Sequence, residues 1–156
     1  MVKQSPLYPV WSSMKRRCYN KNTYGYEHYG GRGIVVCDEW LHDSESFIDW
    51  ALLSGWSRGL YFDRINNDGN YEPSNCRFVT PQTSSCNTRL LANSNKSGYR
   101  GVHWHKDNKK WVSQMTINGK RTYFGCFDSP RLAAIRYDVE AFLLDDGRPM
   151  NFIEAR

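Results

Sequence analysis

Residues 99–125 read YRGVHWHKDNKKWVSQMTINGKRTYFG and predict two hairpins in succession, and hence a three-stranded antiparallel sheet. The Asn118-Gly119 pair is the strongest short signal for a hairpin, because both central residues of a two-residue type I′ turn need positive φ. Such a turn also sets the register of the flanking strands. The expected pairs are Ile117 with Lys120, Thr116 with Arg121, Met115 with Thr122, Gln114 with Tyr123, and Ser113 with Phe124.

The predicted sheet has two unlike faces, because successive side chains of a strand point to opposite sides. One face is polar and cationic, and it carries Val112, Gln114, Thr116, Arg121 and Tyr123. The other face is apolar, and it carries Trp111, Met115 and Phe124. The apolar face needs a cover.

A helix that could cover the apolar face follows the third strand. Ser129 can cap its first turn, Pro130 suits the first helical position, and Gly147 with Pro149 ends the element. Its packed face is expected to consist of large residues at helical spacing: Leu132, Ile135, Val139 and Phe142. The fold class is therefore predicted as α+β, with this sheet packed on one helix and its cationic face left open.

Basic residues concentrate where the sheet is predicted. The chain has a net charge of +5, and residues 89–125 alone carry eight Lys and Arg residues against one acidic residue. Residues 1–88 carry nine of each sign. A charged run is usually a solvated face, but a zone this one-sided within a folding unit indicates a surface that faces phosphates.

Short motifs spread over residues 97–152 resemble the plant ethylene-response-factor (Apetala-type) DNA-binding domain. They are YRGV from Tyr99, Trp111, YFGCFDS from Tyr123, Ala133-Ala134, Tyr137-Asp138 and Asn151-Phe152. The resemblance implies that the sheet enters the major groove of double-stranded DNA, as a β-ribbon can. The implied DNA contacts are Arg100, Gly101, His103, His105, Gln114, Thr116, Arg121, Tyr123 and Tyr137.

The chain departs from the usual Arg, Arg, Glu and Arg of the plant family at four of these positions: His103, His105, Gln114 and Thr116. A different base sequence is therefore expected. Arg100 has the wrong strand parity relative to His103 unless a β-bulge lies near Gly101. A further alternative is an RNA-binding face that stacks bases on Trp104 and Tyr123.

The first half of the chain contains a second pattern, LYFDRINNDGNYEPSNCRFVTPQTSSCNTR at residues 60–89. It predicts a strand that ends in Asp63-Arg64, a polar loop, a strand over Cys76–Val79, and a helix that begins at Thr80-Pro81 and carries Asn87. Together with the motifs RCYN and YGGRGI, it resembles the HNH (ββα-metal) endonuclease superfamily. The likeness is to the branch in which Arg replaces the usual first His, which includes a rare-cutting restriction enzyme and many phage proteins, and it spans roughly residues 8–89.

This resemblance implies a site for one Mg²⁺ or Mn²⁺ ion held by Asp63 and Asn87, which would polarise the scissile phosphate of DNA. Asn75 is expected to brace the loop by hydrogen bonds to the backbone. Arg64 replaces the usual general base, and a guanidinium does not give up its proton near neutral pH. Arg64 is therefore expected to stabilise the charge of the phosphorane.

The group that takes the proton from water is left open between His28 and Tyr29, with Tyr26 as a further candidate. An imidazole titrates near neutral pH, whereas a tyrosine would have to be acidified by the metal or by nearby arginines. These side chains could instead merely pack the adjoining glycine-rich turn. Two basic residues are open between phosphate clamps and salt-bridge partners: Arg32 and Arg77.

The five cysteines are odd in number, contain no Cys-x-x-Cys pair and follow no signal peptide. This pattern predicts a reducing, cytoplasmic location, which is the host-cell cytoplasm if the chain is phage-encoded. Buried cysteines are favoured over a structural zinc site, which normally needs a close ligand pair. A soluble protein is expected, because no apolar run has membrane-spanning length.

The predicted organisation is an HNH-like nuclease domain in residues 1–90, a linker in residues 91–96, and an Apetala-type DNA-binding domain in residues 97–156. The predicted function is a metal-dependent DNA endonuclease of the phage or homing type, which hydrolyses a phosphodiester. The alternative is a sequence-specific DNA-binding regulator whose nuclease domain is inactive. Double-stranded DNA is the expected partner, with no membrane and no small-molecule substrate, and the choice between monomer and homodimer is open.

Overall fold

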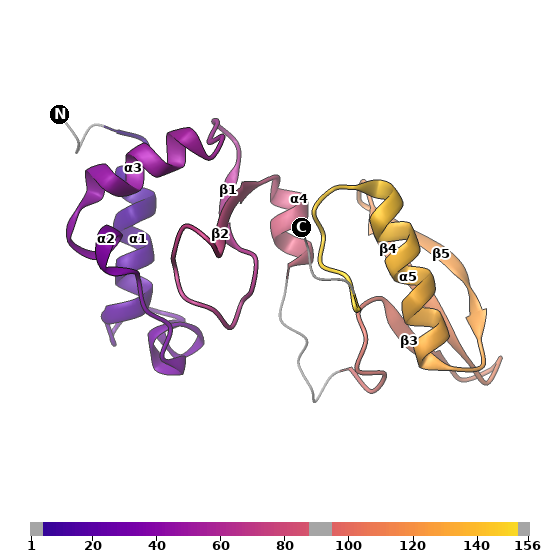
Figure 1. Cartoon of the computed structure of the whole chain (residues 1–156). Coiled ribbons are helices and arrows are strands. Elements are labelled where there is room, and N and C mark those ends of the chain that lie inside the picture. The colour runs from indigo at the N-terminus through magenta and orange to yellow at the C-terminus, as the bar shows by residue number, and fades with distance from the viewer. Residues whose placement is uncertain (1–4, 88–94, 153–156) are drawn as a thin grey trace. The chain divides into compact units, whose positions relative to one another are not determined.

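The computed structural model describes residues 5–87 and 95–152, and the chain forms two compact units, Met1–Pro81 and Gln82–Arg156 (Figure 1). The mixture of helices with antiparallel sheets confirms the α+β class. The predicted domain boundary and most of the predicted linker lie outside the described residues and stay predictions. Within the described ranges, no helix has the length and apolarity needed to cross a membrane.

The first unit combines three α-helices with a two-stranded sheet. Its elements are α1 (Tyr8–Tyr19), the 3₁₀ turns η2 (Tyr26–His28) and η3 (Gly30–Arg32), α2 (Asp38–His42), α3 (Ser44–Leu53), β1 (Tyr61–Arg64) and β2 (Cys76–Val79). Asp43 begins α3 by accepting a 2.8 Å hydrogen bond from the Glu45 amide, as an N-cap residue does.

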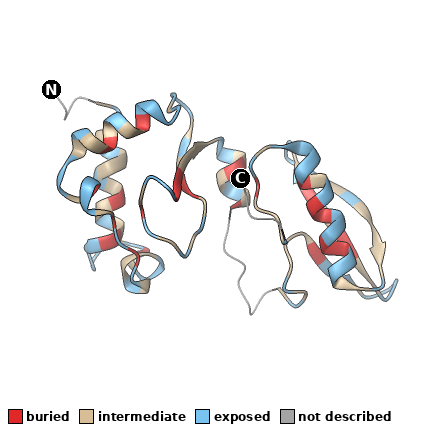
Figure 2. Ribbon diagram, viewed as in Figure 1, coloured by how far each residue is buried: buried red, intermediate tan, exposed pale blue. Residues whose placement is uncertain are grey.

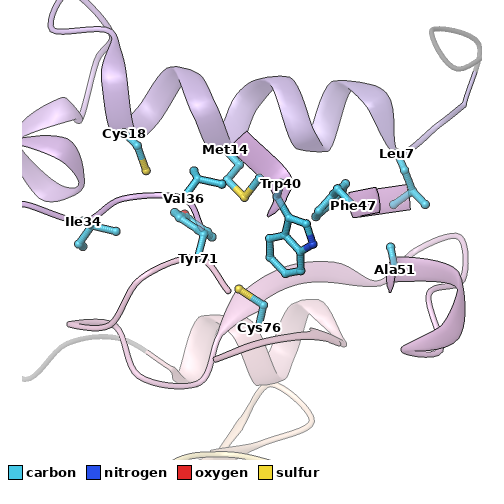
Figure 3. Close-up of a cluster of buried hydrophobic side chains, with 10 residues drawn as sticks. All are labelled: Leu7, Met14, Cys18, Ile34, Val36, Trp40, Phe47, Ala51, Tyr71 and Cys76. Carbon is cyan, nitrogen blue, oxygen red and sulfur yellow. The ribbon is translucent and has the colours of Figure 1, made fainter. Parts of the chain in front are cut away.

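The core of this unit is a cluster of buried side chains (Figure 3). The cluster consists of Leu7, Met14, Cys18, Ile34, Val36, Trp40, Phe47, Ala51, Tyr71 and Cys76. The rings of Trp40 and Phe47 meet edge to face at 5.3 Å, and Phe47 meets Phe62 of β1 in the same way. Because Tyr71 and Cys76 belong to the loop and strand that follow β1, this core also fixes the β1–β2 hairpin.

The β1–β2 hairpin places Asp63 opposite Arg77 and Arg64 opposite Cys76. Its long loop returns to the body of the unit at Tyr71, whose amide donates to the Val35 carbonyl and whose carbonyl accepts from the amide of Cys37, at 2.9 and 2.8 Å. α4 (Pro81–Cys86) follows β2, so the elements occur in the order strand, loop, strand, helix.

The second unit contains α4, a three-stranded antiparallel sheet and one long helix. Its further elements are β3 (Val102–His105), β4 (Lys110–Ile117), β5 (Lys120–Phe127) and α5 (Pro130–Leu144). The strand order β3-β4-β5 confirms the predicted meander. Four of the predicted β4–β5 pairs are also confirmed, from Ile117 with Lys120 to Gln114 with Tyr123.

The predicted pair of Ser113 with Phe124 is wrong. The register shifts between Ser113 and Gln114, and Ser113 lies opposite Gly125, so Phe124 is the extra residue of a β-bulge. Gly125 has a φ of 126°, a conformation that glycine adopts readily and other residues rarely do. The bulge brings Phe127 opposite Trp111, where both pack against the helix.

α5 packs on the sheet with small side chains, and the predicted packed face is wrong (Figure 2). Ala133 and Ala134 are fully buried, and Tyr137, Asp138 and Ala141 are nearly so. The large residues expected there are exposed: Leu132, Ile135, Val139 and Phe142. Helical periodicity does not tell which of the two apolar stripes of this helix packs against the sheet. The stripe that contains the alanines packs there, because their small side chains allow the helix to approach the sheet closely.

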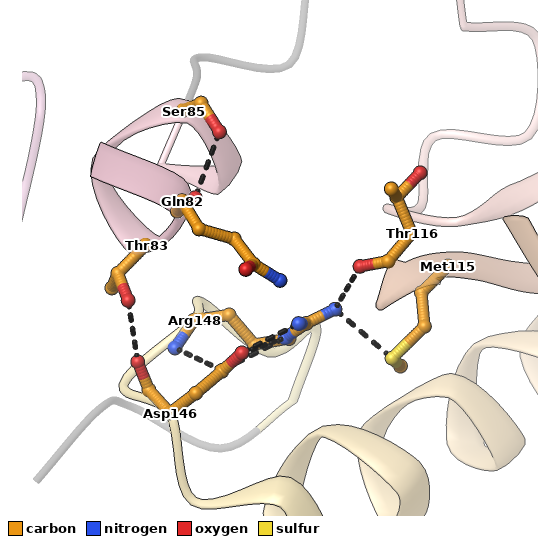
Figure 4. Close-up of polar contacts among 7 residues, drawn as sticks. All are labelled: Gln82, Thr83, Ser85, Met115, Thr116, Asp146 and Arg148. Atoms are coloured by element: carbon orange, nitrogen blue, oxygen red, sulfur yellow. Dashed lines mark hydrogen bonds and ion pairs between the residues drawn. The ribbon is translucent and has the colours of Figure 1, made fainter. Parts of the chain in front are cut away.

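The segment after α5 is anchored by a buried guanidinium (Figure 4). Arg148 Nε lies 2.8 Å from Oδ1 of Asp146, and Nη1 donates to the carbonyl of Thr116 over 3.2 Å. Nη1 also lies 3.0 Å from Sδ of Met115. The Thr83 hydroxyl on α4 donates to the Asp146 carbonyl over 2.8 Å, so α4 is tied to the same segment.

A second anchor joins this segment to the start of the sheet. The Asn151 side chain accepts a 2.7 Å hydrogen bond from the Arg100 amide, just before β3. The carboxylate of Asp138 on α5 in turn accepts from the amides of Asn151 and Phe152, at 2.7 and 2.8 Å. These residues hold helix, tail and first strand together.

Candidate functional site

Arg64 lies at the end of β1 with only 6% of its surface exposed. Its guanidinium faces the rings of Tyr71 and Tyr29, with centroids 4.7 and 5.2 Å away, and Nη1 donates to the Gly69 carbonyl over 2.8 Å. A second guanidinium, that of Arg17, lies 4.9 Å from the centroid of Tyr29. Two cations therefore converge on one pair of tyrosine rings, an arrangement that aromatic quadrupoles stabilise.

Asn75 closes the loop between β1 and β2. Its Oδ1 accepts from the Asn66 amide over 2.8 Å, and its Nδ2 donates to the carbonyls of Asn66 and Asn70 at 3.1 and 2.8 Å. Gly69 lies against this side chain, because a Cβ at that position would lie 2.6 Å from Nδ2. The loop is thus held in one shape next to Arg64, while a catalytic role of Asn75 stays a prediction.

The two arginines left open between clamps and salt-bridge partners both have acidic partners in the structure. Nε and Nη2 of Arg77 lie 3.4 Å from Oδ2 of Asp63 across the hairpin. Arg32 forms an ion pair with Asp68 and donates to the carbonyls of His28 and Asn67. The first contact joins the two strands of the hairpin, and the second holds the loop between them.

A carboxylate and an amide are the oxygen ligands that a hard divalent cation prefers, so the donor chemistry of Asp63 and Asn87 fits Mg²⁺ or Mn²⁺. A cation at Asp63 would share Oδ2 with Arg77. Asn87 is buried at the end of α4 and belongs to the second unit, which is not placed relative to the first. Joint binding of a metal by these two residues therefore stays a prediction. In residues 5–87 and 95–152 no cluster of three or more His, Cys, Asp or Glu side chains could hold a metal.

The two candidates for the general base lie in different surroundings. The His28 imidazole is largely exposed, 3.5 Å from the carboxylate of Glu27. Tyr29 lies within the arginine pair, and its hydroxyl accepts from Nη1 of Arg17 at 3.4 Å. Of the two, Tyr29 is the one beside Arg64. Arg17 had no predicted role, although it opens the RCYN motif, which was the available signal.

The β-sheet of the second unit has an exposed face on the side away from α5. His103, Thr116, Arg121 and Tyr123 are exposed on this face, and Gln114 is half-buried between them. The Tyr123 hydroxyl donates to Sγ of Cys126 over 3.1 Å, which raises the pKa of Tyr123. We call these five residues, His103, Gln114, Thr116, Arg121 and Tyr123, the open face.

Arg100 and Gly101 lie at one end of the open face, before β3. Gly101 has a φ of 68°, and a Cβ there would collide with the ring of Tyr137 and the carbonyl of Gln114. Tyr137 is buried beneath it, and this burial raises the pKa of Tyr137, so the structure gives that residue a packing role. Arg100 is half-buried, which lowers its pKa, and its Nη1 lies 3.5 Å from the Cys86 carbonyl.

A hollow of about 310 Å³ joins Arg100 to the open face. It is lined by Arg100, Gln114, Thr116 and Arg121, with Arg148 in its wall. Three guanidinium groups thus border one depression at the end of the sheet. His105, the remaining predicted contact, lies at the other end of β3, where its Nδ1 accepts from the Asn108 amide at 3.3 Å.

No family model and no solved structure matches this chain. Two plant proteins do, both from Arabidopsis thaliana. The ethylene-responsive transcription factor ERF024 is 46% identical over 48 residues, which cover 30% of this chain and 26% of the plant protein. The AP2-like ethylene-responsive transcription factor TOE2 is 27% identical over 111 residues, 70% of this chain and 22% of the plant protein. The chain thus spans only about a quarter of the length of these plant relatives.

A third relative comes from a bacteriophage and is matched over most of its length. Protein 3.8 of Escherichia phage T7 is 32% identical over 90 residues, which make up 56% of this chain. Its name states no activity. Because the match covers 74% of the phage protein, the chain belongs to the family of Protein 3.8 of Escherichia phage T7.

Proposed function

We propose that the protein binds double-stranded DNA through the open face of its three-stranded sheet. The observation that carries the proposal is the exposure of His103, Thr116, Arg121 and Tyr123 on the side of the sheet that α5 leaves uncovered. The similarity to two plant transcription factors supports the same partner.

The side chains of the open face match the chemistry of a major groove. An arginine such as Arg121 can donate two hydrogen bonds to O6 and N7 of guanine, and a glutamine such as Gln114 can pair with adenine. The methyl group of Thr116 can contact the methyl group of thymine. Arg100, beside the hollow, is suited to a phosphate contact that fixes the sheet on the duplex.

The test compares Arg121→Ala with Arg136→Ala. Both variants remove one exposed guanidinium, but Arg136 lies on α5, where it pairs with Glu140. Fluorescence anisotropy with a pool of randomised duplexes, followed by selection of bound sequences, gives affinity and preference. Arg121→Ala should lose about 1–3 kcal/mol of binding free energy and relax the preference at one base, with Arg136→Ala close to wild type. Equal affinities for wild type and Arg121→Ala would contradict docking through this face.

As a second candidate function, we propose that the protein cleaves the bound DNA as a metal-dependent endonuclease. Three features support it: the pair Asp63-Arg64 at the end of β1, the loop held closed by Asn75, and the tyrosine beside two guanidinium groups. Motifs in residues 8–89 that resemble the HNH superfamily support the same function.

In this proposal Arg64 and Arg17 supply positive charge next to the phosphate that reacts, which stabilises the charge of the phosphorane. Bound Mg²⁺ would polarise the phosphodiester and stabilise the leaving 3′-oxygen. As a phenolate, Tyr29 would accept a proton from the attacking water. The carboxylate of Asp63 and the amide oxygen of Asn87 would be the protein ligands of the cation.

The test is incubation of supercoiled plasmid with Mg²⁺ or Mn²⁺ and the wild type, Asp63→Ala, Tyr29→Phe or His28→Ala. Asp49→Ala, an exposed carboxylate on α3, is the matched control. Nicked circles should form with the wild type, the control and His28→Ala, and should be lost with Asp63→Ala and Tyr29→Phe. Wild-type protein that binds DNA without nicking it would contradict the nuclease proposal and favour a DNA-binding regulator.

A further inference from the structure

α5 carries a stripe of large apolar side chains on the side turned away from the sheet. We call Leu132, Ile135, Val139 and Phe142 the outer stripe; their surfaces are 52%, 42%, 43% and 62% exposed. Leu143 and Phe152, at 71% and 46% exposed, extend it on either side. An apolar patch of this extent on a soluble domain indicates an interaction surface.

The outer stripe is shaped to receive another helix. Its residues are spaced by three, four and three positions, which is the a and d spacing of a heptad repeat. A groove of about 400 Å³ runs along it, lined by Ile135, Val139, Phe142, Leu143 and Phe152. Side chains from a second helix of the same spacing would fill such a groove as knobs fill holes.

The charges beside the outer stripe make it complementary to itself in one orientation. Arg131 is exposed at the start of α5 and Asp145 is exposed just past its end. In an antiparallel pair, the Arg131 of each helix faces Asp145 of the other, and two-fold symmetry repeats the contact at both ends. In a parallel pair, Arg131 would instead face the second helix's Arg136, a repulsive contact.

We propose that the protein forms a two-fold symmetric dimer in which the α5 helices of two copies pack antiparallel through the outer stripe. Leu132 of each copy packs beside Phe142 of the other, and Ile135 beside Val139. Asp138, which flanks the centre of the stripe, is engaged by Asn151 and Phe152 and leaves no like-charge contact at the two-fold axis. This association does not depend on either proposed function.

The test measures the mass of the full-length protein by sedimentation over a wide concentration range. Val139→Glu places a charge in the middle of the stripe, and Leu53→Glu makes the same kind of change at an exposed leucine of α3. The wild type and Leu53→Glu should form dimers, while Val139→Glu should dissociate at least roughly tenfold more easily. Both positions are exposed, so the melting temperature of each folded monomer should be preserved.

The sign of one further variant reports the orientation. Arg131→Asp should weaken an antiparallel dimer, because it brings two acidic side chains together at each end. In a parallel dimer the same change would strengthen association by removing the repulsion with Arg136. A wild type that stays monomeric up to its solubility limit would overturn the proposal, as would a dimer that Val139→Glu leaves intact. A monomer that Val139→Glu destabilises would show that the chain itself covers the stripe, which overturns it as well.

Discussion

Arg64 shows how this fold keeps a buried guanidinium next to neutral groups. Burial raises the pKa of the Tyr71 phenol well above its ordinary value and raises the pKa of the Cys76 thiol to about 12, so both stay protonated at neutral pH. Neither therefore supplies a negative charge against Arg64. Arg17 lies on the same rings, so two guanidinium groups meet at this corner of the first unit.

At the scale of single residues, Asn75→Ala should destabilise the first unit by about 2–4 kcal/mol. The change removes three hydrogen bonds and leaves backbone groups of the loop without their partner. Urea unfolding followed by fluorescence measures the effect. Asn22→Ala, an exposed change in the same unit, should stay within about 0.5 kcal/mol of wild type. Equal stabilities for the two variants would refute the bracing role.

The sequence was informative about single residues only where a motif named them. Asp63, Arg64 and Asn75 follow from a contiguous pattern and lie together around one hairpin. Arg17 lies far from that pattern in the chain and reaches the rings of Tyr29 and Tyr71 only through packing. No local signal places two distant side chains on the same ring, which is why their contact could not be predicted.

At the scale of elements, prediction succeeded where geometry is local and failed where packing decides. The Asn118-Gly119 turn fixes the neighbouring pairs, because a two-residue turn permits one register. The bulge at Phe124 follows from how the far ends of β4 and β5 meet the helix, and no turn signal encodes it. The start of α5 at Pro130 was predicted correctly, but its packed face was not, because two apolar stripes share one helical period.

The segment after α5 provides a prediction about pH. Hydrogen bonds from Arg148 lower the pKa of Asp146 below its ordinary value near 3.8. A carboxyl group whose pKa is lower in the folded state stabilises the fold at pH values above its ordinary, unfolded-state pKa. This stabilisation is lost as the pH falls through the folded-state pKa. Thermal unfolding of the second unit, followed by circular dichroism, should therefore shift to lower temperature as the pH drops below about 4.

Asp146→Asn should remove this part of the acid dependence. At neutral pH it should cost about 3–5 kcal/mol, because it leaves the buried guanidinium of Arg148 without its counter-charge. Asp128→Asn, which removes an exposed partner of Lys110, should cost less than about 1 kcal/mol. If both variants melted alike at neutral pH, the anchoring role of Asp146 would be wrong.

At the scale of the whole molecule, the buried residues form separate clusters, one in the first unit and two in the second. Separate cores predict two unfolding transitions. Phe47→Ala should lower the free energy of unfolding of the first unit by about 3–5 kcal/mol, because a fully buried ring is lost. Gly101→Ala should lower the free energy of unfolding of the second unit, because the added Cβ would collide with the ring of Tyr137. Calorimetry of the full chain measures both transitions. If there were a single transition and each variant shifted it equally, the prediction of two separate transitions would be wrong.

The hydrogen bond between the Asn151 side chain and the backbone of Arg100 joins positions 51 residues apart. The second unit therefore cannot complete its fold until its C-terminal segment has been synthesised. A ribosome synthesises all three strands before it adds Asn151, whose side chain holds the start of the first strand. Until then, the nascent sheet lacks the side chain that fixes the backbone before β3, and a chain truncated just beyond α5 should be more open to proteases. The sheet that would read a duplex is therefore complete only when the segment around Asn151 has been made, and not when its strands have been made.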